Sequence, residues 1–158
     1  MAPFSFLRAM KTIEWHRFFK HFEPEEYLSP GGLVLFHKKN IIPFDPIILL
    51  AIEQLRDSLN YNRNEGHIYS KKEITLVINT GDQNLRGFVT PEEWYFKRPR
   101  EKDQIYSFHL WCAADLHSPE LPIYTLFHYA KLQNFPGLIR HSGYIHADYR
   151  TGEPYVKE

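Results

Sequence analysis

The chain has 158 residues, with 43% hydrophobic side chains and equal numbers of basic and acidic residues, 19 each, so that the net charge is zero. This length fits one domain, and the neutral charge argues against a general nucleic-acid binder, which needs a basic surface. The single cysteine, Cys112, excludes an internal disulfide. The apolar run at 41–50 is interrupted by Pro43, Asp45 and Pro46, so we expect no membrane span.

Residues 1–28 predict an N-terminal helical segment. The start of the chain lacks a basic region followed by a long apolar stretch, so we expect no secretory signal and synthesis in the cytoplasm. The sequence Glu23-Pro24-Glu25-Glu26 is typical of a helix start, because proline suits the first turn and carboxylates interact favourably with the positive end of the helix dipole. After Pro30-Gly31-Gly32, we expect a short strand over residues 33–36.

Asp45-Pro46 indicates the start of the clearest helix, with aspartate as the cap and proline in the first helical position. Its apolar residues recur at helical spacing: Ile48, Ile52, Leu55 and Leu59. The polar residues 60–73 then predict a loop. Residues 74–79 are apolar and β-branched, which favours a buried central strand.

Residues 80–106 form a long, irregular, charged and aromatic segment, and loops of this length in small domains are commonly functional. We expect a short strand at 113–116, a helix from Ser118-Pro119 to Asn134, and a final strand at 144–149. Helices early in the chain with strands and one helix later predict an α+β fold, with a small antiparallel sheet flanked by helices.

His109, Asp115 and His146 are the candidate metal ligands, because two imidazoles and one carboxylate are typical of an open, hydrolytic zinc site. An aspartate within an apolar strand, as at Asp115, needs a cation or several donors. On a strand, His146, Asp148 and Arg150 project from one face. Asp148 is therefore a candidate general base, or a residue that orients a metal ligand. The alternative for 146–150 is the solvent-exposed polar face of an edge strand.

Two segments resemble one family. Ser107–Leu116 is similar to the Ser-x-His…Ala-x-Asp segment of the zinc D-alanyl-D-alanine carboxypeptidase and murein endopeptidase family, whose fold hedgehog signalling domains share. Gly137–Arg150 resembles its closing Gly…Phe-Val-His-Val-Asp-x-Arg strand, in the branch that ends His-x-Asp. His21–Tyr27 and Pro46–Leu59 fit earlier parts of the family pattern. The resemblance implies a single zinc peptidase-like domain over residues 1–158, with its metal-site core at 74–150.

The resemblance implies that His109, Asp115 and His146 bind one zinc ion and that Asp148 is the catalytic base, because the family's usual glutamate is replaced by Gly143. It also implies a guanidinium after the central strand, which Arg86 would supply. The His–Asp spacing departs from the family: positions 109 and 115 are six apart, where a spacing of seven is usual. A second reading gives Cys112 as a fourth ligand of a closed structural site.

The implied function is zinc-dependent hydrolysis of an amide bond in a peptidoglycan stem peptide or cross-link, as a murein endopeptidase or carboxypeptidase. The absence of a signal favours a phage lysin that is made in the cytoplasm and acts on the cell wall after release, or as a virion component. The alternative is a non-catalytic structural or virion module that retains the fold, with zinc as a structural staple or absent. The shortened spacing and Gly143 favour that alternative.

Overall fold

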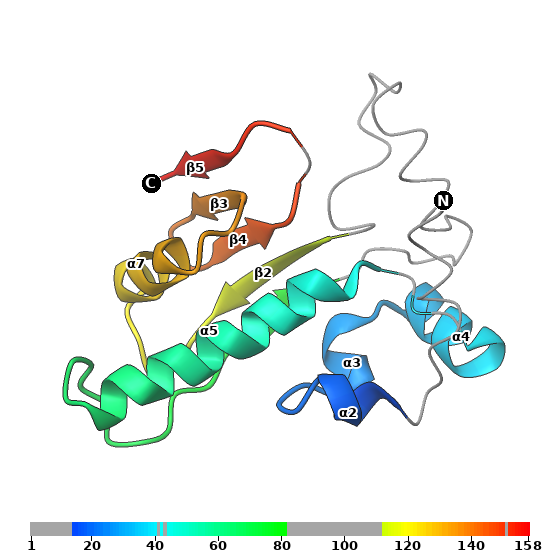
Figure 1. The fold of residues 1–158 in the computed structure, drawn as a ribbon, viewed down its shortest axis with the longest axis horizontal. Coiled ribbons are helices and arrows are strands. Elements are labelled where there is room, and N and C mark those ends of the chain that lie inside the picture. Colours follow the sequence, from blue (N-terminus) through cyan, green and yellow to red (C-terminus); the bar gives the residue numbers. More distant parts are fainter. Residues whose placement is uncertain (1–13, 41, 43, 82–111, 151) are drawn as a thin grey trace.

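The computed structural model describes residues 14–40, 42, 44–81, 112–150 and 152–158. The helices in this part are α2 (Trp15–Phe18), α3 (Pro24–Tyr27), α4 (Pro30–Lys39), α5 (Pro46–Asn64) and α7 (Ile123–Leu132). The strands are β1 (Val77–Thr80), β2 (Ala113–His117), β3 (Gly137–Arg140), β4 (Ile145–Asp148) and β5 (Tyr155–Lys157). Helices α2 to α4 gather near one end of α5, and α7 lies beside β3 and β4 (Figure 1). The predicted α+β class is confirmed.

The five strands form one sheet in the order β1-β2-β4-β3-β5. The pairs β1–β2, β2–β4 and β3–β4 are antiparallel, but β3 and β5 are parallel. The expectation of a wholly antiparallel sheet is therefore wrong at β5. The predicted strand at 144–149 is observed as β4 but is not the last one, because the chain returns after residue 150 to place β5 along β3. None of the helices in the described part has the length and apolar character that a bilayer crossing requires.

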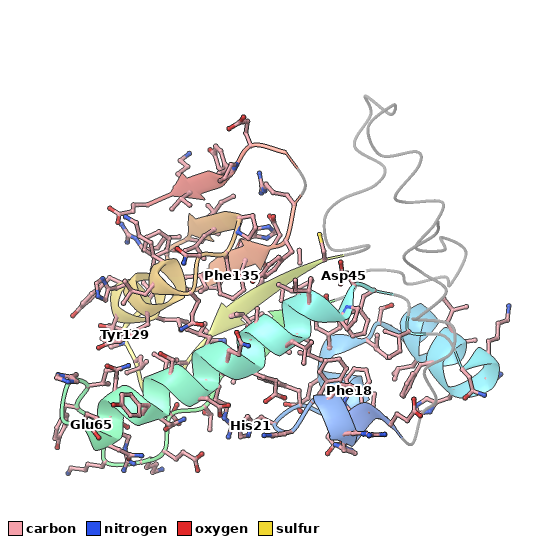
Figure 2. All side chains as sticks on the ribbon, in the orientation of Figure 1. Phe18, His21, Asp45, Glu65, Tyr129 and Phe135 are labelled. Atoms are coloured by element: carbon pink, nitrogen blue, oxygen red, sulfur yellow. The ribbon has the colours of Figure 1, made fainter. Side chains whose placement is uncertain are left out.

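Helix α5 is the central support of the fold, and it begins as the sequence predicts. The Asp45 carboxylate accepts a hydrogen bond from Ile47 N at 3.0 Å, and Pro46 occupies the first helical position. The four predicted apolar positions of this helix have no exposed surface. The helix extends to Asn64, so the first part of the predicted 60–73 loop is helical. Figure 2 shows Asp45 and Glu65 at opposite ends of α5, with side chains packed along its length.

The N-terminal helices enclose an aromatic part of the core. Trp15 lies against Phe19, Phe36 and Phe44, with ring centroids 4.6, 5.2 and 6.0 Å away. The predicted helix start at Glu23 is confirmed as α3, where Glu23 and Glu26 form a capping box. Because edge-to-face aromatic pairs contribute more than their buried area alone, this cluster ties α2 and α4 to the segment that precedes α5.

The predicted strand at 33–36 is wrong, since these residues lie within α4. Ser29 caps this helix by accepting a hydrogen bond from Gly32 N at 3.1 Å, and Pro30 follows at the first position. The buried residues Gly32, Leu35 and Phe36 recur at intervals of three and four, which is the spacing of one helix face. Capping therefore outweighs the strand propensity of a short apolar run.

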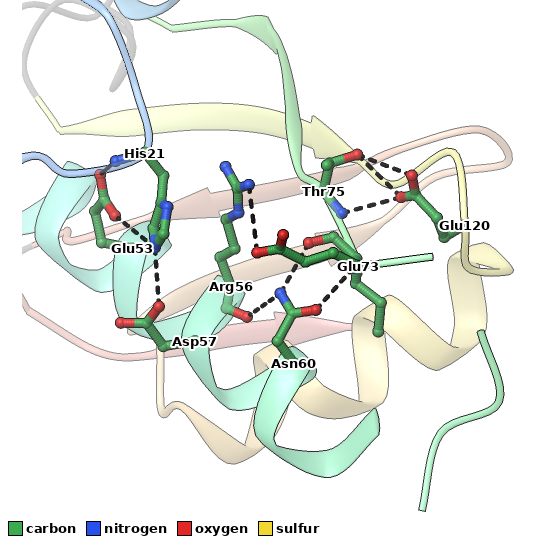
Figure 3. Close-up of polar contacts among 9 residues, drawn as sticks. His21, Glu53, Arg56, Asp57, Asn60, Glu73, Thr75 and Glu120 are labelled. Carbon is green, nitrogen blue, oxygen red and sulfur yellow. Dashed lines mark hydrogen bonds and ion pairs between the residues drawn. The ribbon is translucent and has the colours of Figure 1, made fainter. Parts of the chain in front are cut away.

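The predicted central strand at 74–79 is also wrong in its position within the sheet. Ile74 and Leu76 are buried, but pairing begins only at Val77, and β1 lies at the edge with β2 as its neighbour. Side chains fix the preceding segment instead: Asn60 exchanges two hydrogen bonds with the backbone of Ile74, and Glu120 accepts from Thr75 N at 3.0 Å (Figure 3).

The helix that the sequence predicts from Ser118 begins five residues later, at Ile123. The Ser118 hydroxyl donates to the Glu120 carboxylate at 3.1 Å and accepts from Glu120 N at 3.3 Å. These bonds form a local turn rather than a helix cap. Pro122 then occupies the cap position of α7.

Candidate metal centre

The candidate site lies on one face of the sheet, across β2 and β4. Asp115 is directly opposite His146 in the antiparallel register, and Ala113 is opposite Asp148. The intervening pairs, Ala114 with Ala147 and Leu116 with Ile145, project to the other face, where they are fully buried in the helical core. The alternation of the two strands therefore separates an apolar face from a polar one, and it brings Asp115, His146 and Asp148 together.

His146 lies between two carboxylates. Its Nδ1 is 3.0 Å from Asp115 Oδ1, and its Nε2 is 2.7 Å from Asp148 Oδ2. The side chains of His146 and Asp115 keep 14% and 18% of their exposure, whereas the Asp148 side chain has none. The ring is thus held at Nε2 by a fully buried carboxylate and at Nδ1 by a partly exposed one.

Asp148 is a buried carboxylate with both oxygens engaged. Oδ1 accepts from Arg150 N at 3.0 Å and from Arg150 Nε at 2.8 Å, and Oδ2 accepts from Arg150 Nη2 at 2.6 Å in addition to its contact with His146. This bidentate pair fixes the carboxylate. The guanidinium in turn lies 5.4 Å from the ring centroid of Tyr155 on β5.

Gly137 makes room for this arrangement. It is directly opposite Asp148 in the β3–β4 register, and a Cβ atom at position 137 would lie 2.1 Å from Asp148 Oδ1 and 2.3 Å from Oδ2. The carboxylate therefore occupies the space of the missing side chain. The sequence marks Gly137 only as the first residue of the segment that resembles the family. Its role at the site was missed, because it depends on the pairing of two strands.

The electrostatics follow from these contacts. Burial alone would lower the pKa of His146, but the hydrogen bonds to Asp115 and Asp148, together with their negative charges, outweigh burial and raise the pKa to about 9. Burial would raise the pKa of Asp148, but Arg150 first and His146 second hold it at about 2. At neutral pH, without metal, an imidazolium therefore bridges two carboxylates.

Two ligand atoms on one tetrahedral zinc, at bond lengths of 2.0–2.2 Å, lie about 3.4 Å apart. His146 Nδ1 and Asp115 Oδ1 are 3.0 Å apart and contact each other directly, so a shared ion would have to move them slightly apart and replace that contact. Asp148 would keep the proton on Nε2, as the carboxylate partners of zinc-binding histidines commonly do. Loss of one proton from the imidazolium would make Nδ1 available as a ligand.

The structure brings together only part of the ligand set that the sequence predicts. Asp115 and His146 meet, but His109 lies outside the described residues, as does Arg86. In the described ranges, no group of three or more His, Cys, Asp or Glu side chains is placed to hold a metal ion. Cys112 is described and buried, so within these ranges it does not complete such a group with Asp115 and His146.

A further histidine lies on the same strand as Asp115. His117 is two residues along β2, so it projects to the same face, and its Nδ1 is hydrogen-bonded to the Asn79 side chain. Asn79 is the extra residue of a β-bulge, because Ile78 pairs with Leu116 and Thr80 with Asp115. The local sequence does not mark His117, because the bulge that brings Asn79 to it depends on the pairing of two strands.

The geometry defines a polar cluster of two carboxylates, an imidazole and a guanidinium on the polar face of the sheet, in which Asp115 and His146 face each other across two strands. Comparison with known proteins finds no matching family model, no matching curated protein and no matching solved structure.

Proposed function

We propose that this chain is a zinc-dependent hydrolase of amide bonds in peptidoglycan stem peptides or cross-links, with a hedgehog-type metallopeptidase fold. The observation that supports the proposal is the facing pair of Asp115 Oδ1 and His146 Nδ1 on adjacent strands, 3.0 Å apart, with Nε2 held by a buried carboxylate. His109 would be the third ligand. The peptidoglycan substrate, and release by a phage or carriage in its virion, rest on the family resemblance of Ser107–Leu116 and Gly137–Arg150.

Each side chain then has a defined task. Asp115 and His146 bind the cation, and zinc, when bound, acts as a Lewis acid that polarises the amide carbonyl. Asp148 keeps the proton on His146 Nε2 and fixes the ring, while Arg150 keeps Asp148 ionised. This assigns Asp148 a positioning role. A carboxylate with a pKa of about 2, no exposed surface and both oxygens engaged is a poor proton acceptor for a reacting water.

Metal analysis of the purified chain tests the ligand set. We expect about one zinc per chain, lost in both His146→Ala and Asp115→Ala. His67→Ala is the matched control, because this histidine is exposed beyond the end of α5. Equal zinc in His146→Ala and His67→Ala would contradict the proposed site.

A second experiment separates an enzyme from a structural module. Purified peptidoglycan sacculi are incubated with the chain, and newly released amino groups are measured together with the masses of the fragments. A hydrolase releases amino groups, stops when zinc is chelated and resumes when zinc is restored. A structural module that is stabilised by zinc binds the metal in the first experiment but releases no amino groups from the sacculi. The alternative function, a structural module, is favoured by the state of Asp148. Both of its oxygens already accept hydrogen bonds, so the residue expected to be the general base is poorly placed to take a proton from water.

A further inference from the structure

A row of side chains crosses the polar face of the sheet and ends at Lys157. In the strand registers, Asp115 is opposite His146, and His146 is opposite Ile139 on β3. Ile139 in turn is opposite Lys157 on β5, which lies beside β3 (Figure 1). Residues that are directly opposite in neighbouring strands project from the same face. Lys157 is therefore on the face of the candidate metal centre, in line with both proposed ligands.

The neighbours of Lys157 agree with this orientation. Two residues earlier, the Tyr155 ring lies 5.4 Å from the Arg150 guanidinium on the polar face. One residue later, Glu158 Oε1 lies 3.7 Å from Lys131 Nζ on α7, the helix that packs against the apolar face. Because side chains alternate along a strand, Lys157 shares the face of Tyr155 and points away from that of Glu158.

The ammonium group of Lys157 is available to a ligand. The side chain is exposed, and within the described part of the chain it forms no ion pair. The guanidinium of Arg150, by contrast, is committed to Asp148 through Nε and Nη2. Between His146 and Lys157 the face is formed by Ile139, which is apolar and half-buried. The metal centre is thus followed by a small apolar surface and then by a positive charge, which suits an apolar residue with a terminal carboxylate.

The spacing of the strands fits such a chain end. An ion between β2 and β4 would be about two and a half strand spacings, roughly 12 Å, from the Cα atom of Lys157. A zinc–oxygen bond covers about 2 Å of this span, and the residue after the scissile carbonyl places its carboxylate about 4 Å further. The four-carbon stem of lysine can span the remaining roughly 6 Å. The geometry therefore suits a carboxylate on the residue next to the scissile bond.

We propose that Lys157 pairs with the terminal carboxylate of the substrate, so that the chain acts as a carboxypeptidase on stem peptides. This inference rests on the proposed function and names the substrate class: a stem peptide with a free C terminus, from which the last residue is released. Hydrolysis breaks the C–N bond, with the hydroxyl group of water added to the carbonyl carbon and its proton to the leaving amine. A peptide whose terminal carboxylate is amidated lacks the group that Lys157 binds.

The test uses the full chain as purified and two synthetic pentapeptides, L-Ala-γ-D-Glu-L-Lys-D-Ala-D-Ala with a free C terminus and the same peptide with a C-terminal amide. The terminal residue released from each peptide is measured by mass spectrometry at several peptide concentrations, which gives kcat/KM. We expect kcat/KM to be about fivefold higher for the free acid, as for a partly exposed ion pair. Lys157→Met removes this preference, Lys157→Arg retains it and Lys157→Glu reverses it.

Lys38→Met is the matched control, because Lys38 is an exposed lysine on α4. Zinc content and sacculus digestion are measured on the same preparations, and each variant should keep the zinc content of the native chain. Equal kcat/KM for the two peptides in the native chain, or equal effects of Lys157→Met and Lys38→Met, would overturn the inference. Sacculus digestion without a carboxylate preference defeats the role of Lys157 and supports the proposed hydrolase. An absence of both digestion and peptide cleavage defeats both proposals.

Discussion

Replacement of Gly137 by alanine is the sharpest test of the Asp148 arrangement. The new Cβ atom would lie 2.1 Å from Asp148 Oδ1, where ordinary contact begins near 3.4 Å, so the carboxylate must retreat by at least roughly 1 Å. It cannot do so freely, because Arg150 and His146 hold it at 2.6–3.0 Å and it has no exposed surface. Overpacking costs about 1–3 kcal/mol, and disturbed hydrogen bonds to a charged group cost about 1.5–3 kcal/mol.

We therefore expect Gly137→Ala to lose about 4 kcal/mol of unfolding free energy and roughly 10 °C in Tm. Zinc affinity should fall by about 10- to 100-fold, as when the partner of a ligating histidine is disturbed. Urea unfolding and competition with a fluorescent chelator measure the two effects. Gly143→Ala is the control in the same hairpin, because a Cβ atom at position 143 would meet nothing within 4 Å. Equal midpoints and equal zinc affinities for the two variants would refute the reasoning.

Three further results are expected. Asp148→Ala should destabilise the fold by about 3 kcal/mol in urea unfolding, because it leaves Arg150 without its buried partner; a loss no larger than in Asp57→Ala, an exposed carboxylate, would contradict this. Asp45→Ala should cost about 1 kcal/mol through loss of the α5 cap, and an unchanged urea midpoint would contradict it. Burial raises the pKa of Glu120, but hydrogen bonds from Thr75 and Ser118 outweigh it and lower that pKa below 4.5. The Glu120 carboxylate therefore stabilises the fold above pH 4.5, and this stabilisation is lost as the pH falls further. The free energy of unfolding should decrease less with falling pH in Glu120→Gln than in the native chain.

Local signals predicted the elements whose ends are marked by capping residues. Asp45-Pro46 located α5 because aspartate and proline act within one turn. The same rule applied to Ser29-Pro30 would have predicted α4, but the glycines at 31 and 32 and the apolar run after them favoured a strand. The edge position of β1 was not predictable from its composition, because a strand's place in a sheet depends on its partners.

The same distinction between local sequence and strand pairing applies to the candidate site. That His146 and Asp148 share a face follows from the period of a strand, and the structure places both on the polar side of β4. The contact of Asp115 with His146 depends on the β2–β4 register, which joins residues 31 apart in the chain. The burial of Asp148 depends on Gly137 across a second pair of strands. Long-range register of this kind leaves no mark in a local pattern.

The parallel strand β5 connects residues 155–157 to the candidate metal centre. Tyr155 lies opposite Gly137 in the β3–β5 register, and its ring stacks near the Arg150 guanidinium that holds Asp148. Removal of residues 153–158 would take away this ring contact without removing Asp115, His146 or Asp148. Zinc binding at the proposed site should therefore weaken when β5 is removed.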